Sequence, residues 1–170
     1  MLKKAYFAGG CFWGLEELFR TQEGVLEITA GYTGGMDIIS STGSLQMPTY
    51  ENHAGFAEAL EIVYDDSLTN YKNLLDFFFQ IHNPTTLNRQ GNDIGDSYRS
   101  AIFYQDENEL EQAKEFIDIV NKSGRWENPV VTTLEPFKKF YKAEEYHQDY
   151  LQKNPAGYTC HAIYFDSYLK

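Results

Sequence analysis

One cysteine, Cys11, follows a short apolar run and precedes a segment with helical periodicity, within the sequence GCFWG at residues 10–14. A thiol at the start of a helix can act as a nucleophile, because the first-turn N–H groups and the helix dipole favour its thiolate. The rings of Phe12 and Trp13 follow directly, and such rings can wall a pocket for a small apolar group. The alternative is a buried structural thiol, since cysteine is among the most buried residue types.

The charges near Cys11 oppose thiolate formation. Glu16 and Glu17 follow shortly after it, and the formal net charge of the chain is −11. Either the helix N-terminus outweighs these charges, or the thiolate forms only when a substrate is bound.

A carboxylate in an apolar strand segment, Glu58, is the second candidate. Period-two alternation in FAEALEIVY (residues 56–64) places Glu58 on the same face as Leu60 and Ile62. Burial raises the pKa of a carboxyl group, so Glu58 could carry a proton near neutral pH. The alternative is that the strand end is solvated and Glu58 is an ordinary surface charge.

A polar segment, His82–Tyr98, is longer than most loops in compact domains, and such loops are often functional. It carries Asp93 and ends at Tyr98, while Tyr50 lies in an earlier loop. Either tyrosine hydroxyl could donate a hydrogen bond to an oxygen held near the thiol. A solvated loop is the alternative, and a calcium loop is disfavoured because the EF-hand spacing is absent.

The second cysteine, Cys160, lies in a tail that follows the turn residues Asn154 and Pro155. A mobile tail cysteine could reach Cys11 and form a disulfide, and an idle thiol is the alternative. Two cysteines this far apart are neither a metal-binding pair nor a disulfide framework. We expect a reducing cytosol, in which a disulfide is transient and catalytic. His147 is expected to be a packed or hydrogen-bonded side chain rather than a ligand.

The hydrophobic periodicity predicts strands that alternate with helices. We expect strands at 5–8, 25–32, 56–64, 99–104 and 130–134, and helices marked by Leu15–Phe19, Tyr71–Phe78, Leu110–Val120 and Phe137–Leu151. Asp66 and Ser67 are the predicted cap of the second helix, and 36–50, 82–98 and the tail from about 154 to 170 are expected to be irregular. This pattern predicts a single domain, residues 1–170, with an α/β (α+β) two-layer sandwich, a mixed sheet and a ferredoxin-like core.

The composition excludes several classes of partner. The net charge of −11 argues against a nucleic acid and against an anionic membrane surface, because both are bound through basic patches. No segment is long enough to span a membrane. The apolar run before Cys11 is shorter than the ~7–15 apolar residues of a signal peptide.

Separated motifs along the chain carry a family resemblance. They are GCFWG at residues 10–14, AGYTGG at 30–35, PTYEN at 48–52, GFAEALEIVYD at 55–65, NRQGNDIGDSYRSAIFY at 88–104 and FYKAEEYHQDYLQKNP at 140–155. Through these motifs, in this order, the chain resembles the type A peptide methionine sulfoxide reductases, the MsrA family. The resemblance implies a compact α/β sandwich that reduces the S epimer of methionine sulfoxide, free or in proteins, as repair of oxidative damage.

The resemblance also implies roles for the candidate residues. Cys11 is the nucleophile that attacks the sulfoxide sulfur, and Glu58 is the acid that protonates the leaving oxygen. Tyr50 and Tyr98 hold this oxygen, and Asp93 shapes the site through hydrogen bonds. Methionine then leaves and Cys11 remains as a sulfenic acid.

The remaining roles concern substrate binding and regeneration of the enzyme. Phe12 and Trp13 form the aromatic wall that receives the methyl group. Cys160 is the resolving cysteine, and thioredoxin or dithiothreitol reduces the Cys11–Cys160 disulfide. No metal or organic cofactor is implied, and we expect a cytoplasmic monomer.

Two departures from the family and two rival functions have to be considered. The chain between Tyr50 and Glu58 is shorter than in many members. The chain reads GFAE where many members read GHAE, so Phe56 replaces a polar ring beside Glu58. A cysteine hydrolase or acyltransferase is the first rival, and it needs His53 or His147 as the base for Cys11. A non-catalytic protein that binds oxidised peptides through its aromatic side chains is the second.

Overall fold

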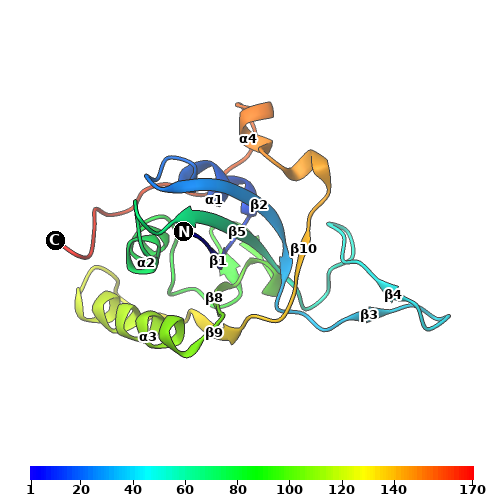
Figure 1. Ribbon diagram of the computed structural model, residues 1–170, viewed down its shortest axis with the longest axis horizontal. Helices are drawn as coiled ribbons and strands as arrows, with labels where there is room; N and C mark the ends of the chain where they lie inside the picture. Colours follow the sequence, from blue (N-terminus) through cyan, green and yellow to red (C-terminus); the bar gives the residue numbers. More distant parts are fainter.

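The computed structural model describes residues 1–170 and consists of a curled mixed sheet with helices packed on it (Figure 1). The six-stranded sheet has the order β10-β2-β5-β1-β8-β9. Its strands are β1 (Leu2–Gly9), β2 (Val25–Thr33), β5 (Ala57–Asp65), β8 (Ser100–Tyr104), β9 (Thr133–Pro136) and β10 (Phe140–Lys142). The helices are α1 (Phe12–Phe19), α2 (Tyr71–Gln80), α3 (Glu107–Lys122) and the short α4 (Tyr150–Lys153).

The central part of the sheet has the predicted ferredoxin-like connectivity. In chain order it runs β1-α1-β2-β5-α2-β8, and the neighbouring pairs β2·β5, β5·β1 and β1·β8 are antiparallel. The helix α3 then crosses over to β9, which pairs with β8 in parallel, as a parallel pair requires a long connection. The prediction of a mixed sheet with a ferredoxin-like core is therefore confirmed.

The two faces of the sheet pack differently. On one face, Phe7 of β1 and Leu60 and Ile62 of β5 join the side chains of α1, α2 and α3 in one buried cluster. On the other face, Tyr6 belongs to a smaller cluster, and its ring stacks on Phe137 at 3.9 Å. This alternation places every second residue of β5 on the face covered by the helices, and Cys11 lies at the start of α1 on that face.

The predicted helix at Phe137–Leu151 is wrong. The segment forms the edge strand β10, which pairs with β2, then a 3-10 turn at Glu145–His147 and the short α4. The exposed edge of β2 offers backbone partners that a helix would leave unpaired. The side-chain amide of Gln148 also pairs with the backbone of β2. Its oxygen accepts the N–H of Ala30 and its nitrogen donates to the Ala30 carbonyl, both at 2.9 Å. Asp149 has a φ of 54°, a left-handed conformation that interrupts a helix.

Smaller corrections concern caps and loops. The cap of α2 is Asn70, whose side chain accepts the N–H of Asn73 at 2.8 Å, and not Asp66 or Ser67. The last predicted strand begins later than expected, because the N–H of Val131 bonds the carbonyl of Pro84 at 2.7 Å. The segments predicted to be irregular contain two small hairpins, β3 (Ile38–Ile39) with β4 (Leu45–Gln46), and β6 (Arg89–Gln90) with β7 (Asp93–Ile94), and a 3-10 turn at Asp96–Tyr98.

The tail beyond α4 has no helix or strand, as predicted. None of the helices combines the length and the apolar character that crossing a bilayer requires.

Candidate active site

Cys11 occupies the N-cap position of α1, at the point where β1 ends. The turn between the two elements needs Gly10, whose φ is 97°, a conformation that favours glycine. A Cβ atom at Gly10 would also come within 2.7 Å of the side chain of Gln90. The thiol lies between a strand and a helix, as predicted. The loop that contains Gln90 packs closely on this junction, and Cys11 is buried.

Glu58 lies on the face of β5 that is covered by α1, and it is fully buried. Its Oε1 accepts the backbone N–H of Phe12 at 3.2 Å, while its Oε2 is buried without a partner. Burial raises the pKa of this carboxyl from 4.5 to about 8, and the Phe12 N–H opposes the shift. The prediction of a buried carboxyl group is confirmed, and the alternative of a solvated strand end is wrong.

The Cys11 thiol is held in its neutral form. Burial raises its pKa first, and the charges of Glu58 and Asp93 add to the effect. The backbone N–H of Trp13 lowers the pKa but does not outweigh burial. The resting site therefore favours the neutral thiol, in spite of the position of Cys11 at the helix N-terminus.

Two tyrosine hydroxyls lie in the field of the same carboxyl group. Burial raises the pKa of Tyr50 to about 12 and that of Tyr98 further, and in both the charge of Glu58 is the next cause. Both hydroxyls are therefore neutral hydrogen-bond donors at neutral pH. Tyr50 is fixed by its backbone N–H, which donates to Glu144 Oε2 at 3.0 Å.

The two aromatic residues after Cys11 differ in exposure. Phe12 is fully buried, while Trp13 is partly exposed. The indole of Trp13 stacks on the ring of Tyr150 at 3.8 Å and 8°, and its Nε1–H donates to His147 Nδ1 at 2.9 Å. Tyr50 adds a further parallel ring at 6.2 Å from Trp13. The indole is thus held in one orientation at the edge of the site.

His147 is buried and hydrogen-bonded, as predicted, but its role in orienting Trp13 was not foreseen. Because Nδ1 accepts from Trp13, the ring proton is on Nε2, which is buried without a partner. Burial lowers the pKa of the ring, which keeps it neutral and able to accept. No sequence pattern indicated this contact or the stacking of Tyr150.

A buried acid, Glu16, ties the segment with these rings to α1. Its Oε1 accepts the N–H of Asp149 at 2.9 Å, and Arg20 donates to the Asp149 carboxylate at 2.9 Å. Burial raises the pKa of Glu16 to about 7, and the Asp149 charge contributes. Glu16, considered above only as a charge that opposes the thiolate, thus has a structural contact that the sequence did not reveal.

The tail carries Cys160 to the edge of the GCFWG motif. The Nε2–H of His161 donates to the carbonyl of Gly9 at 2.7 Å. A Cβ atom at Gly14 would clash with the side chains of Thr159 and His161, so the tail lies directly on the first turn of α1. The docking of this tail could not be predicted from the sequence.

Cys160 faces the loop that contains Asp93. Its sulfur lies 3.6 Å from Asp93 Oδ2 and 3.8 Å from the carbonyl of Gln90. Burial raises the pKa of the Cys160 thiol, and Asp93 adds to this. Cys11 and Cys160 are both free thiols, and the charge of Cys160 is among the causes that raise the Cys11 pKa.

The side-chain amide of Gln90, a loop residue without a predicted role, is hydrogen-bonded at both its oxygen and its nitrogen. The amide oxygen accepts the N–H of Asn83 at 2.8 Å, and the amide nitrogen donates to the Asn83 carbonyl at 2.9 Å. These bonds bring the start of the loop against the turn at Gly10, so Gln90 positions both Asp93 and the surface on which Cys160 rests.

The two histidines that could serve a hydrolase as its base, His53 and His147, are hydrogen-bonded to other groups. The ring nitrogens of His53 bond the carbonyl of Thr49 at 2.8 Å and the hydroxyl of Ser97 at 2.7 Å. His147 holds Trp13, so neither ring is free to act as a base for Cys11. No group of three or more His, Cys, Asp or Glu side chains is arranged to bind a metal ion.

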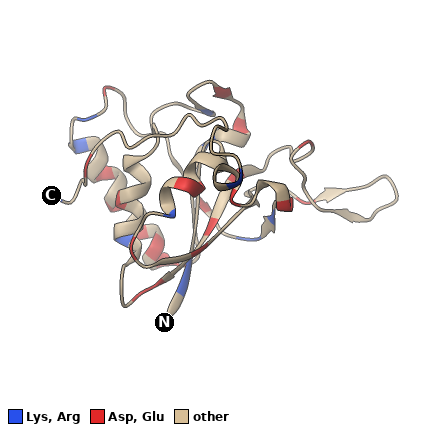
Figure 2. Ribbon diagram, turned by 90° about the horizontal axis from the view of Figure 1, so that it is seen from above, with Lys and Arg blue, Asp and Glu red and all other residues tan.

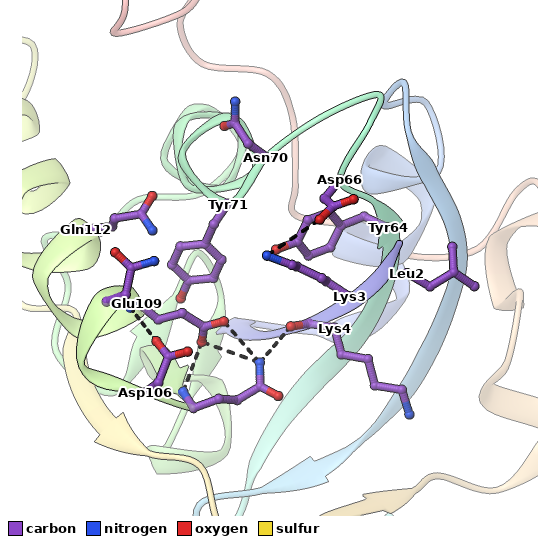
Figure 3. Close-up of a pocket in the computed structure, with 12 residues that line it drawn as sticks. Leu2, Lys3, Lys4, Tyr64, Asp66, Asn70, Tyr71, Asp106, Glu109 and Gln112 are labelled. Atoms are coloured by element: carbon purple, nitrogen blue, oxygen red, sulfur yellow. Dashed lines mark hydrogen bonds and ion pairs between the residues drawn. The ribbon is translucent and has the colours of Figure 1, made fainter.

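A cavity of about 580 Å³ lies away from these residues, among β1, α2 and α3 (Figure 3). Its carboxylates already have partners within the chain. Glu109 accepts the backbone N–H of Gln105 at 2.9 Å, Asp106 caps α3, and Lys3 lies 3.6 Å from Asp66. None of the candidate catalytic residues lines this cavity, whose polar groups stabilise the junction of the helices.

Comparisons with known proteins agree with this geometry. The family model "Peptide methionine sulfoxide reductase" matches residues 3–167. The peptide methionine sulfoxide reductase MsrA of Mycolicibacterium gilvum is 55% identical over 159 residues, covering 94% of this chain and 89% of the relative. The enzyme of the same name from Mycobacterium tuberculosis is 52% identical over 161 residues, with 95% and 84% covered.

Solved structures give the same result. Mxr1 from Saccharomyces cerevisiae in reduced form is similar with a TM-score of 0.87 at 37% identity, covering 95% of this chain and 92% of that chain. Methionine sulfoxide reductase A of Corynebacterium diphtheriae is similar with a TM-score of 0.74 at 32% identity, covering 93% and 77%. The match of sequence and fold over nearly the whole chain shows that this protein belongs to the peptide methionine sulfoxide reductase family.

Proposed function

We propose that this chain reduces methionine S-sulfoxide, free or in proteins, to methionine, with Cys11 as the nucleophile and Glu58 as the acid. The observation that carries the proposal is the buried Glu58 carboxyl, with a pKa of about 8 and a hydrogen bond to the residue that follows Cys11. A sulfoxide oxygen is a poor leaving group until it is protonated, and a protonated carboxyl group beside the thiol supplies that proton.

The first half-reaction moves one oxygen atom between two sulfurs. The Cys11 sulfur forms a bond to the sulfoxide sulfur, while Glu58 gives a proton to the oxygen. The thiol proton of Cys11 restores the carboxyl group of Glu58. The bonds from the substrate sulfur to the oxygen and to the Cys11 sulfur then break as the protonated oxygen bonds to the Cys11 sulfur. The products are methionine and a Cys11 sulfenic acid, so the methionine sulfur is reduced as the cysteine sulfur is oxidised.

The surrounding side chains bind and orient the substrate. The neutral hydroxyls of Tyr50 and Tyr98 donate to the sulfoxide oxygen. Phe12 and the fixed indole of Trp13 form the apolar wall for the methyl group. Asp93 lies beside Cys160, where it shapes the site through hydrogen bonds.

The second half-reaction restores the thiol. The Cys160 sulfur attacks the Cys11 sulfenic sulfur, a disulfide forms and water leaves. The docking of the tail on the first turn of α1 supports this role for Cys160. A solved complex of Mxr1 with Trx2, similar at 27% identity with a TM-score of 0.64, supports thioredoxin as the reductant of the disulfide.

This chemistry requires only thiols, a carboxyl group and an external dithiol such as thioredoxin or dithiothreitol. We therefore propose that residues 1–170 act as a single catalytic domain without a resident metal or organic cofactor. The net charge of −11 supports a protein that binds neither nucleic acid nor an anionic membrane, and two widely spaced cysteines suit a reducing cytoplasm. We expect the protein to be a monomer.

The test of the proposed function is the fate of the two sulfoxide epimers. With dabsyl-methionine sulfoxide and dithiothreitol, we expect the S epimer to be converted completely to the thioether and the R epimer to remain. Chromatographic separation of the epimers measures this. Equal consumption of both epimers, or of neither, would contradict the proposed function.

The role of Cys160 has its own test. We expect Cys160→Ser to complete one turnover at the wild-type rate and then to stop cycling with thioredoxin, because the sulfenic acid has no resolving thiol. Intact-mass spectrometry after one turnover should find one added oxygen in the variant and the loss of two hydrogens in the wild type. Full thioredoxin-driven cycling of Cys160→Ser would remove Cys160 from the mechanism.

A further inference from the structure

A hairpin projects from the body of the molecule (Figure 1). It consists of β3, β4 and their flanking residues, and we call residues 36–49 the arm. The strands of the arm pair only with each other, so both edges of this small sheet are open. Tyr50, which we propose to bind the sulfoxide oxygen, is the residue that follows the arm.

One face of the arm is apolar and exposed. Ile39 and Leu45 are direct cross-strand partners, so their side chains lie on the same face. Ile39 is 59% exposed, Leu45 is 48% exposed, and Met47, two residues further on, is 60% exposed. Single exposed apolar side chains are ordinary, but a group of them on one projecting element indicates an interaction surface.

The other face attaches the arm to the body. Ile38 is partly buried and packs against the main hydrophobic cluster. At the base of the arm, the hydroxyl of Tyr141 donates to Asp37 at 3.0 Å. At the tip, the N–H of Ser40 bonds the carbonyl of Ser44 at 2.8 Å. The arm is therefore attached to the body through Ile38 and Asp37, and neither contact covers the face that carries Ile39 and Leu45.

The arm is also free of charge beyond its base. Residues 38–50 contain no Asp, Glu, Lys or Arg, although the chain has a net charge of −11. Figure 2 shows the arm as an uncharged projection, whereas charged residues are spread over the body. An approaching polypeptide therefore meets neither charge repulsion nor a charged side chain that would have to be desolvated.

We propose that the arm is a docking surface for the polypeptide that flanks an oxidised methionine, specifically an extended segment with apolar side chains. Such a segment can lie along the hairpin, pairing with an open edge and covering Ile39, Leu45 and Met47. The inference rests on the proposed function, because it names which substrates this site prefers.

The position of the arm along the chain supports this occupant. Met47 precedes Tyr50 by three residues, so their Cα atoms are separated by at most about 10 Å. A segment whose sulfoxide lies at Tyr50 can therefore place its neighbours, three or more residues away, on the arm, whereas free methionine sulfoxide cannot reach it. A second copy of the chain is a poorer occupant, because three half-exposed side chains fall short of the ~800 Å² per partner of a stable dimer.

The test compares a variant of the arm with a variant that carries the same kind of change elsewhere. The arm variant is Ile39→Ser, Leu45→Ser and Met47→Gln in the full chain. The control is Leu2→Ser with Leu68→Ser, since these side chains are 60% and 54% exposed and lie outside the arm. All proteins are compared by circular dichroism and thermal unfolding, so that a folding defect in either variant is recognised.

Three substrates are used with dithiothreitol as the reductant. They are free methionine S-sulfoxide, an extended peptide with one methionine S-sulfoxide and leucines three and five residues from it, and the same peptide with serines in place of the leucines. For the arm variant we expect the KM for the leucine peptide to rise about tenfold, with kcat unchanged. The KM for free methionine sulfoxide and for the serine peptide should stay within twofold, and the control variant should match the wild type.

The outcomes separate the two proposals. If the wild type reduces none of the substrates, the proposed function fails. If the wild type is active and the arm variant has the same KM for the leucine peptide, the docking inference is overturned while the function stands. If sedimentation finds a wild-type dimer that the arm variant loses, with peptide KM unchanged, the arm is a contact between copies and the inference is likewise overturned.

Discussion

Replacement of Cys11 by serine is expected to lower the turnover of methionine sulfoxide by on the order of 10⁴-fold or more. A hydroxyl group of similar size fits the same position, but it is a much weaker nucleophile than a thiol and cannot form a sulfenic acid. The measurement is the release of methionine with dithiothreitol in excess, so that regeneration does not limit the rate.

The matched control for this experiment is Cys160→Ser, which removes the other thiol and leaves the first turnover intact. Binding of a methionine sulfoxide peptide by Cys11→Ser should remain, because the aromatic wall and both tyrosines are unchanged. A Cys11→Ser variant that still produces methionine at the wild-type rate would exclude Cys11 as the nucleophile. Unchanged peptide binding together with an inactive wild type would instead support a non-catalytic binding protein.

Replacement of Glu58 by glutamine is expected to slow the first chemical step by about 10²- to 10⁴-fold, the usual contribution of a general acid. Glutamine keeps the shape of the side chain and the acceptor for the Phe12 N–H, but it has no acidic proton to give. Rapid-quench measurement of methionine formed in the first turnover isolates this step from disulfide reduction. An unchanged burst rate would show that another group protonates the oxygen.

The pKa of Glu58 predicts how the wild-type burst rate depends on pH. Because this pKa is raised to about 8, the carboxyl group is protonated and active as an acid below that pH. The rate should therefore fall as the pH rises through about 8, approaching a tenfold loss per pH unit. Glu58→Gln should lack this fall, since the group that titrates is gone.

The raised pKa of Glu58 also predicts how the stability of the protein depends on pH, which gives a control for misfolding of Glu58→Gln. The folded-state pKa of Glu58 lies above its ordinary value of 4.5, so its contribution is fully present below pH 4.5 and is lost as the pH rises to about 8. Glutamine is neutral throughout this range. We expect Glu58→Gln to be at least as stable as the wild type at pH 8 in urea unfolding, which distinguishes a catalytic defect from misfolding.

Local patterns were sufficient for the parts of the site that lie within single elements. The alternation of β5 placed Glu58 on its buried face, because strand residues two apart must share a face. The junction of β1 and α1 placed Cys11 at a helix N-terminus. The order of strands and helices was sufficient for the ferredoxin-like connectivity.

Local patterns failed where a segment depends on a distant partner. The spacing of 137–151 suits a helix, but the open edge of β2 binds residues 140–142 as β10. The contact of His147 with Trp13 exists only because this segment then returns over α1. Helical spacing alone cannot reveal an open sheet edge, since that edge is formed by other parts of the chain.

By itself, the sequence determined which groups are available for chemistry and the elements that carry them, because side-chain direction follows from local backbone geometry. Only the tertiary structure decided the pKa values and the contacts of those groups. The burial that raises the pKa of Glu58 and Cys11 comes from the packing of β5, α1 and the loop with Asp93. The position of Cys160 is set by the tail, which lies against Gly9 and Gly14. Desolvation and close contact depend on everything that surrounds a group, and most of those surroundings are distant in sequence.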